Sequence, residues 1–194
     1  AAEAGKSLRI CGGGTKGFYG HAVSGEVLDT SVYRGIVAYE PTELVVVVRA
    51  GMPLVELEAE LLSRGQCLPF EPPHFCSASG AGRGATVGGM VAAGISGPRR
   101  AAVGAVRDYV LGVKMIDGKG ELLSFGGQVM KNVAGYDVPR LMAGSLGTLG
   151  LIAEVALKVL PLPVAGMTLR FALSEAEALQ TLNRWGGQPL PLAA

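Results

Sequence analysis

The segment Leu-Arg-Ile-Cys-Gly-Gly-Gly-Thr-Lys-Gly at residues 8–17 runs from a short apolar strand into a loop of glycines. Its glycines match G-x-G-x-x-G, which in Rossmann folds leads into a long helix whose N-terminus holds a pyrophosphate. Here Gly20 and Gly25 follow within eight residues of Gly17, and the residues between have no helical apolar period. A Rossmann fold is therefore not expected. The segment predicts either a loop whose backbone N–H groups bind an anion or, with equal weight, a plain tight turn.

Two further segments of small residues lie downstream. Residues 86–97 begin Thr-Val-Gly-Gly, and residues 144–150 read Gly-Ser-Leu-Gly-Thr-Leu-Gly directly before an apolar stretch. Glycines let a backbone approach a ligand closely, and hydroxyl groups donate hydrogen bonds. The hydroxyl side chains offered by the three segments are Thr15, Thr86, Ser96 and Thr148. Together the segments predict a cradle for a long diphosphate ligand.

The remaining pattern is that of a mixed α and β chain. Pro53 precedes leucines at helical spacing, which predicts a helix that ends at Gly65. Residues 117–120, Asp-Gly-Lys-Gly, predict the turn of a β-hairpin, and Ser174 with Glu177 three residues later predicts a capped helix. We expect strands at 8–10, 27–28, 35–39, 44–49, 110–116, 121–125, 151–160 and 167–173, and short helices at 90–93 and 138–142.

Composition excludes several classes of protein. The chain has 194 residues, 49% of them hydrophobic, and 17 basic against 16 acidic side chains without a basic stripe. Disorder and nucleic-acid binding are therefore not expected. The longest strongly apolar run, residues 44–48, is far too short for a membrane span. Three cysteines without CxxC spacing and no His-x-His pair predict neither a disulfide scaffold nor a metal site, and they fit a cytoplasmic protein.

Four motifs in this order resemble a known family. They are Ile-Cys-Gly-Gly-Gly-Thr at 10–15, Ala-Thr-Val-Gly-Gly-Met at 85–90, Lys-Asn-Val-Ala-Gly-Tyr-Asp at 131–137, and the segment 144–150. The chain resembles the vanillyl-alcohol-oxidase-type (PCMH-type) FAD-binding domain. Within that superfamily, Glu-Pro-Pro-His-Phe at 71–75 and Gly-Pro-Arg-Arg at 97–100 are similar to the FAD-binding subunits of bacterial glycolate oxidases. The resemblance extends over about residues 5 to 192.

The resemblance implies an α+β fold in which two subdomains surround an extended FAD. Residues 1–163 would form the FAD-binding domain, with subdomains of about 1–70 and 71–163. Residues 164–194 would begin a C-terminal cap that is truncated in this chain. Because no His lies in the first glycine-rich loop and Cys11 precedes it, we expect FAD to be bound without a covalent link.

The family motifs also imply which residues bind the cofactor. The first loop would hold the pyrophosphate through its backbone, the second segment would line the diphosphate and ribityl chain, and the third would contact the ribose, adenine or flavin edge. The residues so assigned are Gly12, Gly13, Gly14, Thr15, Lys16, Thr86, Gly88, Gly89, Ala93, Ser96, Gly147, Thr148, Leu149, Gly150 and Ile152. Many relatives have Ser in place of Lys16, whose side chain either adds a charge-assisted phosphate contact or points to solvent.

The implied function is that of a glycolate oxidase subunit, in a complex with a second flavin subunit and an iron–sulfur subunit. The complex would oxidise glycolate, a 2-hydroxy acid, to glyoxylate, in the cytoplasm or peripheral to the inner membrane through its partners. No catalytic residue is assigned: His74, beside two prolines, fits a loop residue better than a base, and Tyr136 with Asp137 fits a structural pin. Two alternatives remain, another FAD-dependent 2-hydroxy-acid dehydrogenase of D-lactate type and a non-catalytic assembly subunit.

Overall fold

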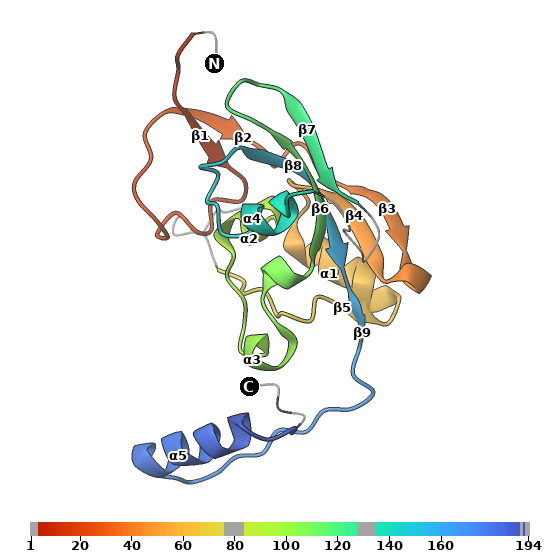
Figure 1. Ribbon diagram of the computed structural model, residues 1–194, viewed down its shortest axis with the longest axis vertical. Coiled ribbons are helices and arrows are strands. Elements are labelled where there is room, and N and C mark those ends of the chain that lie inside the picture. Colours follow the sequence, from red (N-terminus) through yellow and green to blue (C-terminus); the bar gives the residue numbers. More distant parts are fainter. Residues whose placement is uncertain (1–3, 76–83, 128–134, 191, 193–194) are drawn as a thin grey trace.

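The computed structural model describes residues 4–75, 84–127, 135–190 and 192. A five-stranded antiparallel sheet, two small two-stranded sheets and short helices make up the main body, and one helix lies apart from it (Figure 1). The predicted mixture of helix and strand is confirmed. Most of the motif at 131–137 lies outside the described residues.

In chain order the elements are β1 (Leu8–Cys11), β2 (Glu26–Asp29), β3 (Ile36–Glu40), η1 (Pro41–Glu43), β4 (Val45–Arg49), α1 (Leu54–Ser63), β5 (Gln66–Cys67), α2 (Val87–Ala93), α3 (Arg100–Val103), η2 (Val106–Asp108), β6 (Val110–Ile116), β7 (Leu122–Gly126), α4 (Val138–Met142), β8 (Leu151–Lys158), β9 (Leu160–Pro161) and α5 (Glu175–Gly186).

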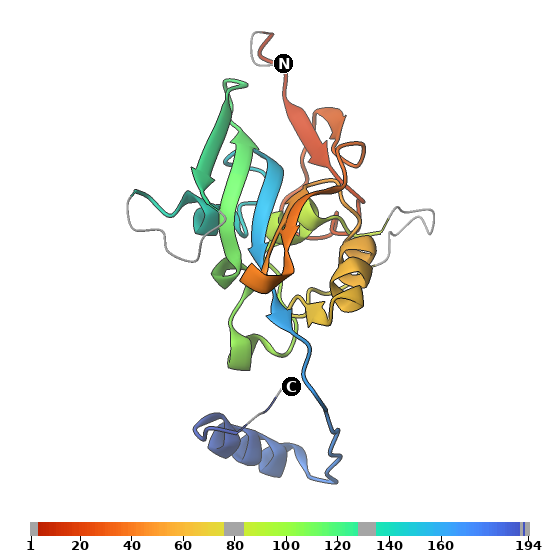
Figure 2. The same ribbon diagram turned by 90° about the vertical axis from the view of Figure 1, so that its right-hand side faces the viewer.

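The central sheet has five antiparallel strands in the order β3-β4-β8-β6-β7. Its inner face buries Val46, Val48, Val155 and Leu157 completely. Against this face lie the buried leucines of α1 and the buried residues of α2, so one hydrophobic core joins the sheet to both helices. Figure 2 shows α1 and α4 on opposite flanks of the sheet. This packing fixes the start of α2, where the second glycine-rich segment lies.

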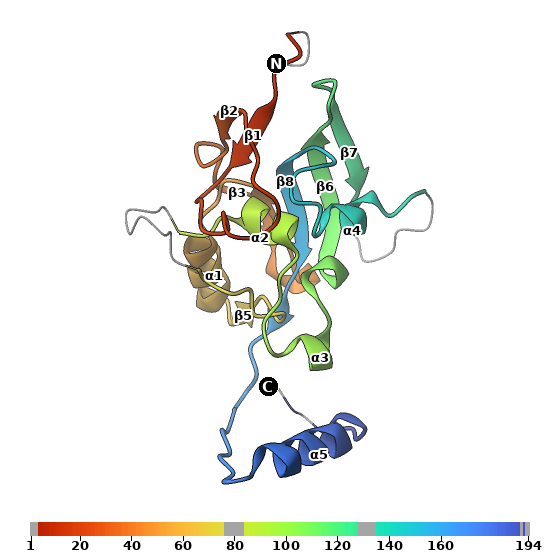
Figure 3. The same cartoon turned by 90° about the vertical axis from the view of Figure 1, so that its left-hand side faces the viewer.

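The strands β1 and β2 pair in parallel and form a separate small sheet. Helix α2 lies between this small sheet and the five-stranded sheet (Figure 3). Strands from both sides of residue 70 belong to the five-stranded sheet, because β4 pairs with β8. The expected boundaries at 70 and 163 themselves stay predictions.

Most expected elements are confirmed, although the strand expected at 151–160 is divided into β8 and β9. Two further expectations differ from the structure. Helix α2 begins at Val87 rather than at 90, because the Thr86 side chain accepts a hydrogen bond from the Gly89 N–H at 3.3 Å and caps the helix three residues earlier. The strand expected at 167–173 is wrong. Its alternating apolar residues are exposed and have no neighbouring strand in the described structure, and alternation without a hydrogen-bonded partner does not make a strand.

The last described helix has the predicted cap. Ser174 Oγ accepts from the Glu177 N–H and the Glu177 side chain accepts from the Ser174 N–H, which is a capping box. The helix α5 buries no residue, and an extended segment after Leu162 joins it to the body (Figures 1 and 2). The Phe171 and Trp185 rings pack 5.4 Å apart and hold this segment against α5.

Candidate functional site

The first glycine-rich loop follows β1, and several of its own backbone N–H groups make no hydrogen bond. The backbone N–H groups of Gly13, Gly14, Thr15 and Lys16 donate to no other residue that the structure describes. Gly14 has φ +68°, a left-handed conformation that favours glycine, and Tyr19 N–H donates to the Lys16 carbonyl at 3.0 Å to close the loop. Consecutive free N–H groups in such a turn form a concavity that binds anions.

Thr15 is the most buried residue of this loop, with 6% of its surface exposed. Its hydroxyl makes no hydrogen bond within the described chain. The Thr15 oxygen is not one of the fully buried side-chain atoms without a partner, so its hydroxyl is open to water or to a ligand that accepts its hydrogen bond. Thr15 is thus a built-in donor of the loop.

The second glycine-rich segment contacts the first. A Cβ placed on Gly12 would overlap Thr86 Oγ1, so the backbone of the loop lies directly on the residue that caps α2. Thr86 is itself 4% exposed. The two segments predicted to bind one ligand are therefore neighbours in space.

The third segment completes the arrangement. The Gly144 N–H donates to Val91 O at 3.0 Å and the Leu146 N–H donates to Ala92 O at 2.9 Å, which ties this segment to the end of α2. Gly147 in turn lies beside Ile10 of β1, whose Cδ1 would be 3.2 Å from a Cβ at that position. Leu146 has φ +53°, a rare conformation for leucine, which these hydrogen bonds hold in place. All three glycine-rich segments meet around α2.

Several predicted site residues also have a packing role. A Cβ on Gly88 would lie 2.6 Å from Ala50 Cβ, and one on Gly150 would lie 2.7 Å from Ile116 O. Ala93 and Ile152 are buried, with 6% and 5% of their surface exposed. The close approach of neighbouring elements is enough to explain why Gly88 and Gly150 are glycines.

The two remaining hydroxyl side chains are engaged locally. Ser96 Oγ accepts from the Val106 N–H at 3.0 Å, and Thr148 Oγ1 donates to Ser145 O at 2.6 Å. The hydrogen of the Ser96 hydroxyl and an acceptor lone pair of Thr148 remain available. Leu149 is about half exposed at the rim of the third segment. The roles of these three residues stay predictions.

An aromatic contact that was not predicted joins the first loop to residues 71–75. The rings of Phe18 and Phe75 pack edge to face with centroids 5.1 Å apart. Lys16 Nζ lies 5.7 Å from the centroid of the Phe75 ring. The sequence shows an aromatic residue in each of the two loops, but it does not show that Phe18 and Phe75, 57 residues apart, pack against each other.

His74 and Arg99 have structural partners. His74 Nε2 lies 2.9 Å from Glu58 Oε2 of α1, in the loop position expected for it. The Arg99 N–H donates to the Glu71 carboxylate at 3.2 Å, and Arg100 is exposed. These contacts place residues 71–75 but do not assemble a catalytic group.

Asp137 pins the start of α4. Its carboxylate accepts from the Arg140 backbone N–H at 3.2 Å and from Arg140 Nε at 3.0 Å, while Arg140 Nη1 reaches Asp108 at 2.9 Å. The structural role expected for Asp137 is therefore confirmed. Tyr136 is 93% exposed and contributes no such contact.

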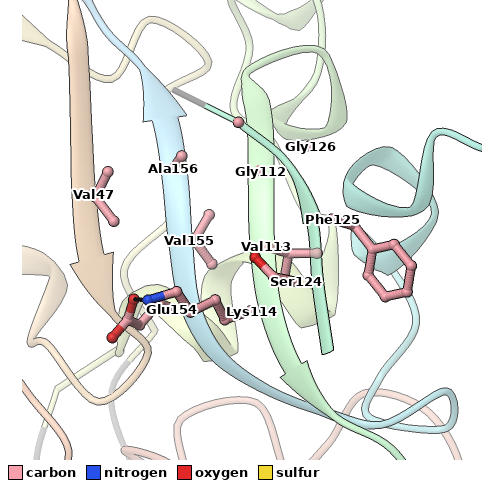
Figure 4. A pocket seen from close by; sticks show the side chains of 11 residues that line it. Val47, Gly112, Val113, Lys114, Ser124, Phe125, Gly126, Glu154, Val155 and Ala156 are labelled. Carbon is pink, nitrogen blue, oxygen red and sulfur yellow. Dashed lines mark ion pairs between the residues drawn. The ribbon is translucent and has the colours of Figure 1, made fainter. Parts of the chain in front are cut away.

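A separate depression lies over the sheet strands β4, β6, β7 and β8 (Figure 4). Glu154 is held there by Lys114 Nζ at 2.8 Å and by the Tyr33 hydroxyl at 2.8 Å. The hydrogen bond from Lys114 is the main cause that lowers the pKa of Glu154 below its ordinary value. None of the predicted cofactor-binding residues lines this depression, so it is distinct from the glycine-rich site.

Within residues 4–75, 84–127, 135–190 and 192, no group of three or more His, Cys, Asp and Glu side chains comes together to hold a metal ion. Over the same residues, no helix has both the length and the apolar character needed to cross a membrane.

The first glycine-rich loop offers the groups that a diphosphate needs. A diphosphate needs hydrogen-bond donors and positive charge, and the site offers the free N–H groups of Gly13 to Lys16, the Thr15 hydroxyl and the Lys16 ammonium. Close contact with an extended ligand needs open backbone, and a Cβ at Gly17 would meet nothing within 4 Å. The donor set is therefore that of a phosphate-binding loop.

Comparison with known proteins gives the same result. The family described as "FAD binding domain" matches residues 1–126. The chain is 53% identical over 186 residues to "Glycolate oxidase subunit GlcE" of Escherichia coli (strain K12), covering 96% of this chain and 51% of that protein. It is 34% identical over 160 residues to "D-lactate dehydrogenase" of Anaerostipes hadrus, covering 81% of this chain and 32% of that protein. The chain thus spans about half the length of the first relative and a third of the second.

Among solved structures, an alkyldihydroxyacetonephosphate synthase superposes with a TM-score of 0.65 at 23% identity, over 85% of this chain and 31% of the other. This likeness concerns the fold alone, and it confirms the expected α+β FAD-binding fold. The match over residues 1–126 confirms FAD as the cofactor. The chain belongs to the family of PCMH-type FAD-binding domains.

Proposed function

We propose that this chain is the FAD-binding part of a glycolate oxidase subunit. The observation that carries the proposal is the identity of 53% to the subunit GlcE, spread over 96% of this chain rather than confined to the glycine-rich motifs. The whole enzyme oxidises glycolate to glyoxylate, and this chain supplies one flavin site to it.

In the proposed site the three glycine-rich segments share the cofactor. The loop of Gly12 to Lys16 binds the diphosphate through its free backbone N–H groups and the Thr15 hydroxyl. Thr86, Gly88, Gly89, Ala93 and Ser96 line the diphosphate and ribityl chain. Gly147 to Gly150 and the backbone of Ile152 contact the remaining edge. Binding is non-covalent, because the first loop offers no His and its only Cys precedes the glycines.

Bound FAD supplies the capacity to accept a hydride from a 2-hydroxy acid. The residues of this chain bind and orient it: Gly12 and Thr86 set the spacing between loop and helix, and the hydrogen bonds from Gly144 and Leu146 to α2 fix the third segment. The groups that remove the substrate's hydroxyl proton and bind its carboxylate are assigned to parts of the enzyme outside these residues.

The proposal extends to domain organisation and partners. Residues 1–163 are the FAD-binding domain, and residues 164–194, with the exposed helix α5, begin a cap that covers the flavin. The partners are a second flavin subunit and an iron–sulfur subunit, in the cytoplasm or at the inner membrane through those subunits.

Two other functions make different predictions. A D-lactate-type dehydrogenase on the same fold is supported by the similarity to the Anaerostipes hadrus protein, at the lower identity of 34%. A non-catalytic assembly subunit would bind its partners without flavin. The unused donors of the first loop favour the flavin-binding function over the assembly subunit, because consecutive N–H groups in such a turn form a concavity that binds anions.

The first test is the visible absorption spectrum of the purified chain, followed by acid precipitation. A flavin spectrum with FAD released into the supernatant supports the proposed site and its non-covalent mode, whereas colour retained in the pellet contradicts that mode alone. The full-length subunit purified with its partners is then assayed for dye reduction with glycolate and with D-lactate. Faster turnover with D-lactate would favour the dehydrogenase, and a complex without flavin in this subunit would favour the assembly role.

A further inference from the structure

The Lys16 side chain occupies an unusual position for a surface lysine. It is half-buried, and burial lowers the pKa of its ammonium group below the ordinary lysine value. No carboxylate of the described chain lies within ion-pair distance of its Nζ. A lysine in a loop normally keeps its charge in water or beside an acid. Here the nearest defined partner is the face of an aromatic ring.

That ring is Phe75, and several contacts determine where it lies. The Phe18 ring packs against it edge to face at 5.1 Å. The preceding residue, His74, is joined to Glu58 of α1 at 2.9 Å, and Pro72 is buried. Two consecutive prolines restrict the backbone just before His74. Phe75 is thus a fixed platform beside the first glycine-rich loop.

A cation over an aromatic face keeps part of its capacity to bind an anion. The ring contacts the ammonium at 5.7 Å without neutralising its charge. Lys16 belongs to the same loop as the free N–H groups of Gly13, Gly14 and Thr15. The unpaired cation and the unsatisfied donors therefore converge on a single loop, and both favour the same kind of ligand.

We infer that Lys16 is a charged ligand of the FAD diphosphate and that Phe75 is the positioning residue that holds it for this role. The inference rests on the proposed cofactor site and assigns to it the Lys16 side chain in addition to the loop backbone. Because a hydrogen bond between charged groups is stronger than one to a neutral donor, Lys16 contributes a substantial part of the affinity for FAD.

The test is a titration of the flavin-free protein with FAD, followed by flavin fluorescence, for the original chain and for Lys16→Met, Lys16→Arg and a control, Lys158→Met. Lys158 lies at the far end of β8 from the third glycine-rich segment and is outside the cofactor site. We expect Lys16→Met to raise the Kd for FAD roughly tenfold at low salt, with a smaller effect at 1 M salt because ions screen the charge. Lys16→Arg should retain most of the affinity, and Lys158→Met should leave it unchanged.

The role of Phe75 is tested by a double-mutant cycle. Phe75→Leu keeps an apolar side chain but removes the aromatic face, and we expect it to raise the Kd for FAD roughly threefold. In the Lys16→Met background the same change should have no further effect, because the two residues act as a unit. Additive effects would overturn the positioning role of Phe75.

Other outcomes separate this inference from the proposed function. If the original chain binds no FAD, the proposed function fails. If the original chain binds FAD and Lys16→Met binds it equally well, the function stands and the role of Lys16 is overturned. A loss of thermal stability in flavin-free Lys16→Met with unchanged FAD affinity would show that Lys16 only joins the two loops.

Discussion

The loop of residues 12–17 and the segments 86–97 and 144–150 are all rich in glycine, but their glycines do different things. In the loop, Gly12 packs against Thr86, but Gly17 has open space around it and the neighbouring N–H groups are unused. In the other segments, Gly88, Gly94 and Gly150 lie against the backbone or side chains of other elements. Glycine content alone therefore reports two distinct requirements: room for a ligand, and room for close packing.

The largest expected effect comes from a packed glycine. Gly94 has φ +67°, and a Cβ there would lie 2.8 Å from Gly144 Cα. Gly94→Ala should lower the free energy of unfolding of the flavin-free protein by about 3 kcal/mol, from left-handed strain and overpacking together. Urea denaturation followed by circular dichroism measures this difference. A loss below roughly 0.5 kcal/mol, the scatter of ordinary surface substitutions, would place Gly94 among the open glycines instead.

The sequence predicted where helices and strands lie along the chain better than it predicted which strands pair with one another. Apolar runs punctuated by Pro and Gly located β4, α1 and β6, because those signals are local. The pairing of β4 with β8, more than 100 residues later, depends on burying one face of each strand in a shared core. Nothing within either strand encodes that choice.

The candidate site could be predicted in part, because its glycine-rich segments are local signals in the sequence. The prediction was incomplete, because contacts between distant loops are not. Three glycine-rich segments stood out in the sequence, and the structure brings them together around α2. The contact of Lys16 with Phe75, and the hydrogen bond from Val106 to Ser96, depend on how distant loops fold against each other. The alternating residues 167–173 failed as a strand because they have no partner strand in the described chain.

The next largest effect is expected on the affinity for FAD, with no loss of stability in the flavin-free protein. Thr15→Val replaces an unbonded hydroxyl by a methyl group of similar size in a residue that is 6% exposed. We expect the Kd for FAD to rise roughly tenfold, about 1.4 kcal/mol, because one donor to the diphosphate is lost. Isothermal titration calorimetry measures this Kd, and the unfolding midpoint of the flavin-free protein should stay the same or rise. A fall in that midpoint would show that the hydroxyl has a partner inside the protein.

Thr86, in the second glycine-rich segment, is the threonine to compare with Thr15 of the first loop. Its hydroxyl oxygen caps α2 by accepting the Gly89 N–H at 3.3 Å. Thr86→Ala should therefore lower the free energy of unfolding by about 1 kcal/mol even without flavin, the usual cost of losing an N-cap. Thermal unfolding compares it with Thr86→Ser, which keeps the cap and should recover most of the loss. If serine is no better than alanine, packing of the Thr86 methyl against Gly12 is the larger contribution.

The smallest effect is expected where the loop is open. A Cβ on Gly17 would meet nothing within 4 Å, and its backbone is outside the left-handed region. Gly17→Ala should change the free energy of unfolding by no more than about 0.5 kcal/mol, with a small gain possible because alanine restricts the unfolded chain. The measurement is the same urea denaturation used for Gly94→Ala. Since both variants add one methyl group to a glycine, a loss at Gly17 as large as that at Gly94 would mean that the first loop is packed as tightly as the second segment. The free N–H groups of Gly13 to Lys16 would then face protein, and the loop could not admit a diphosphate.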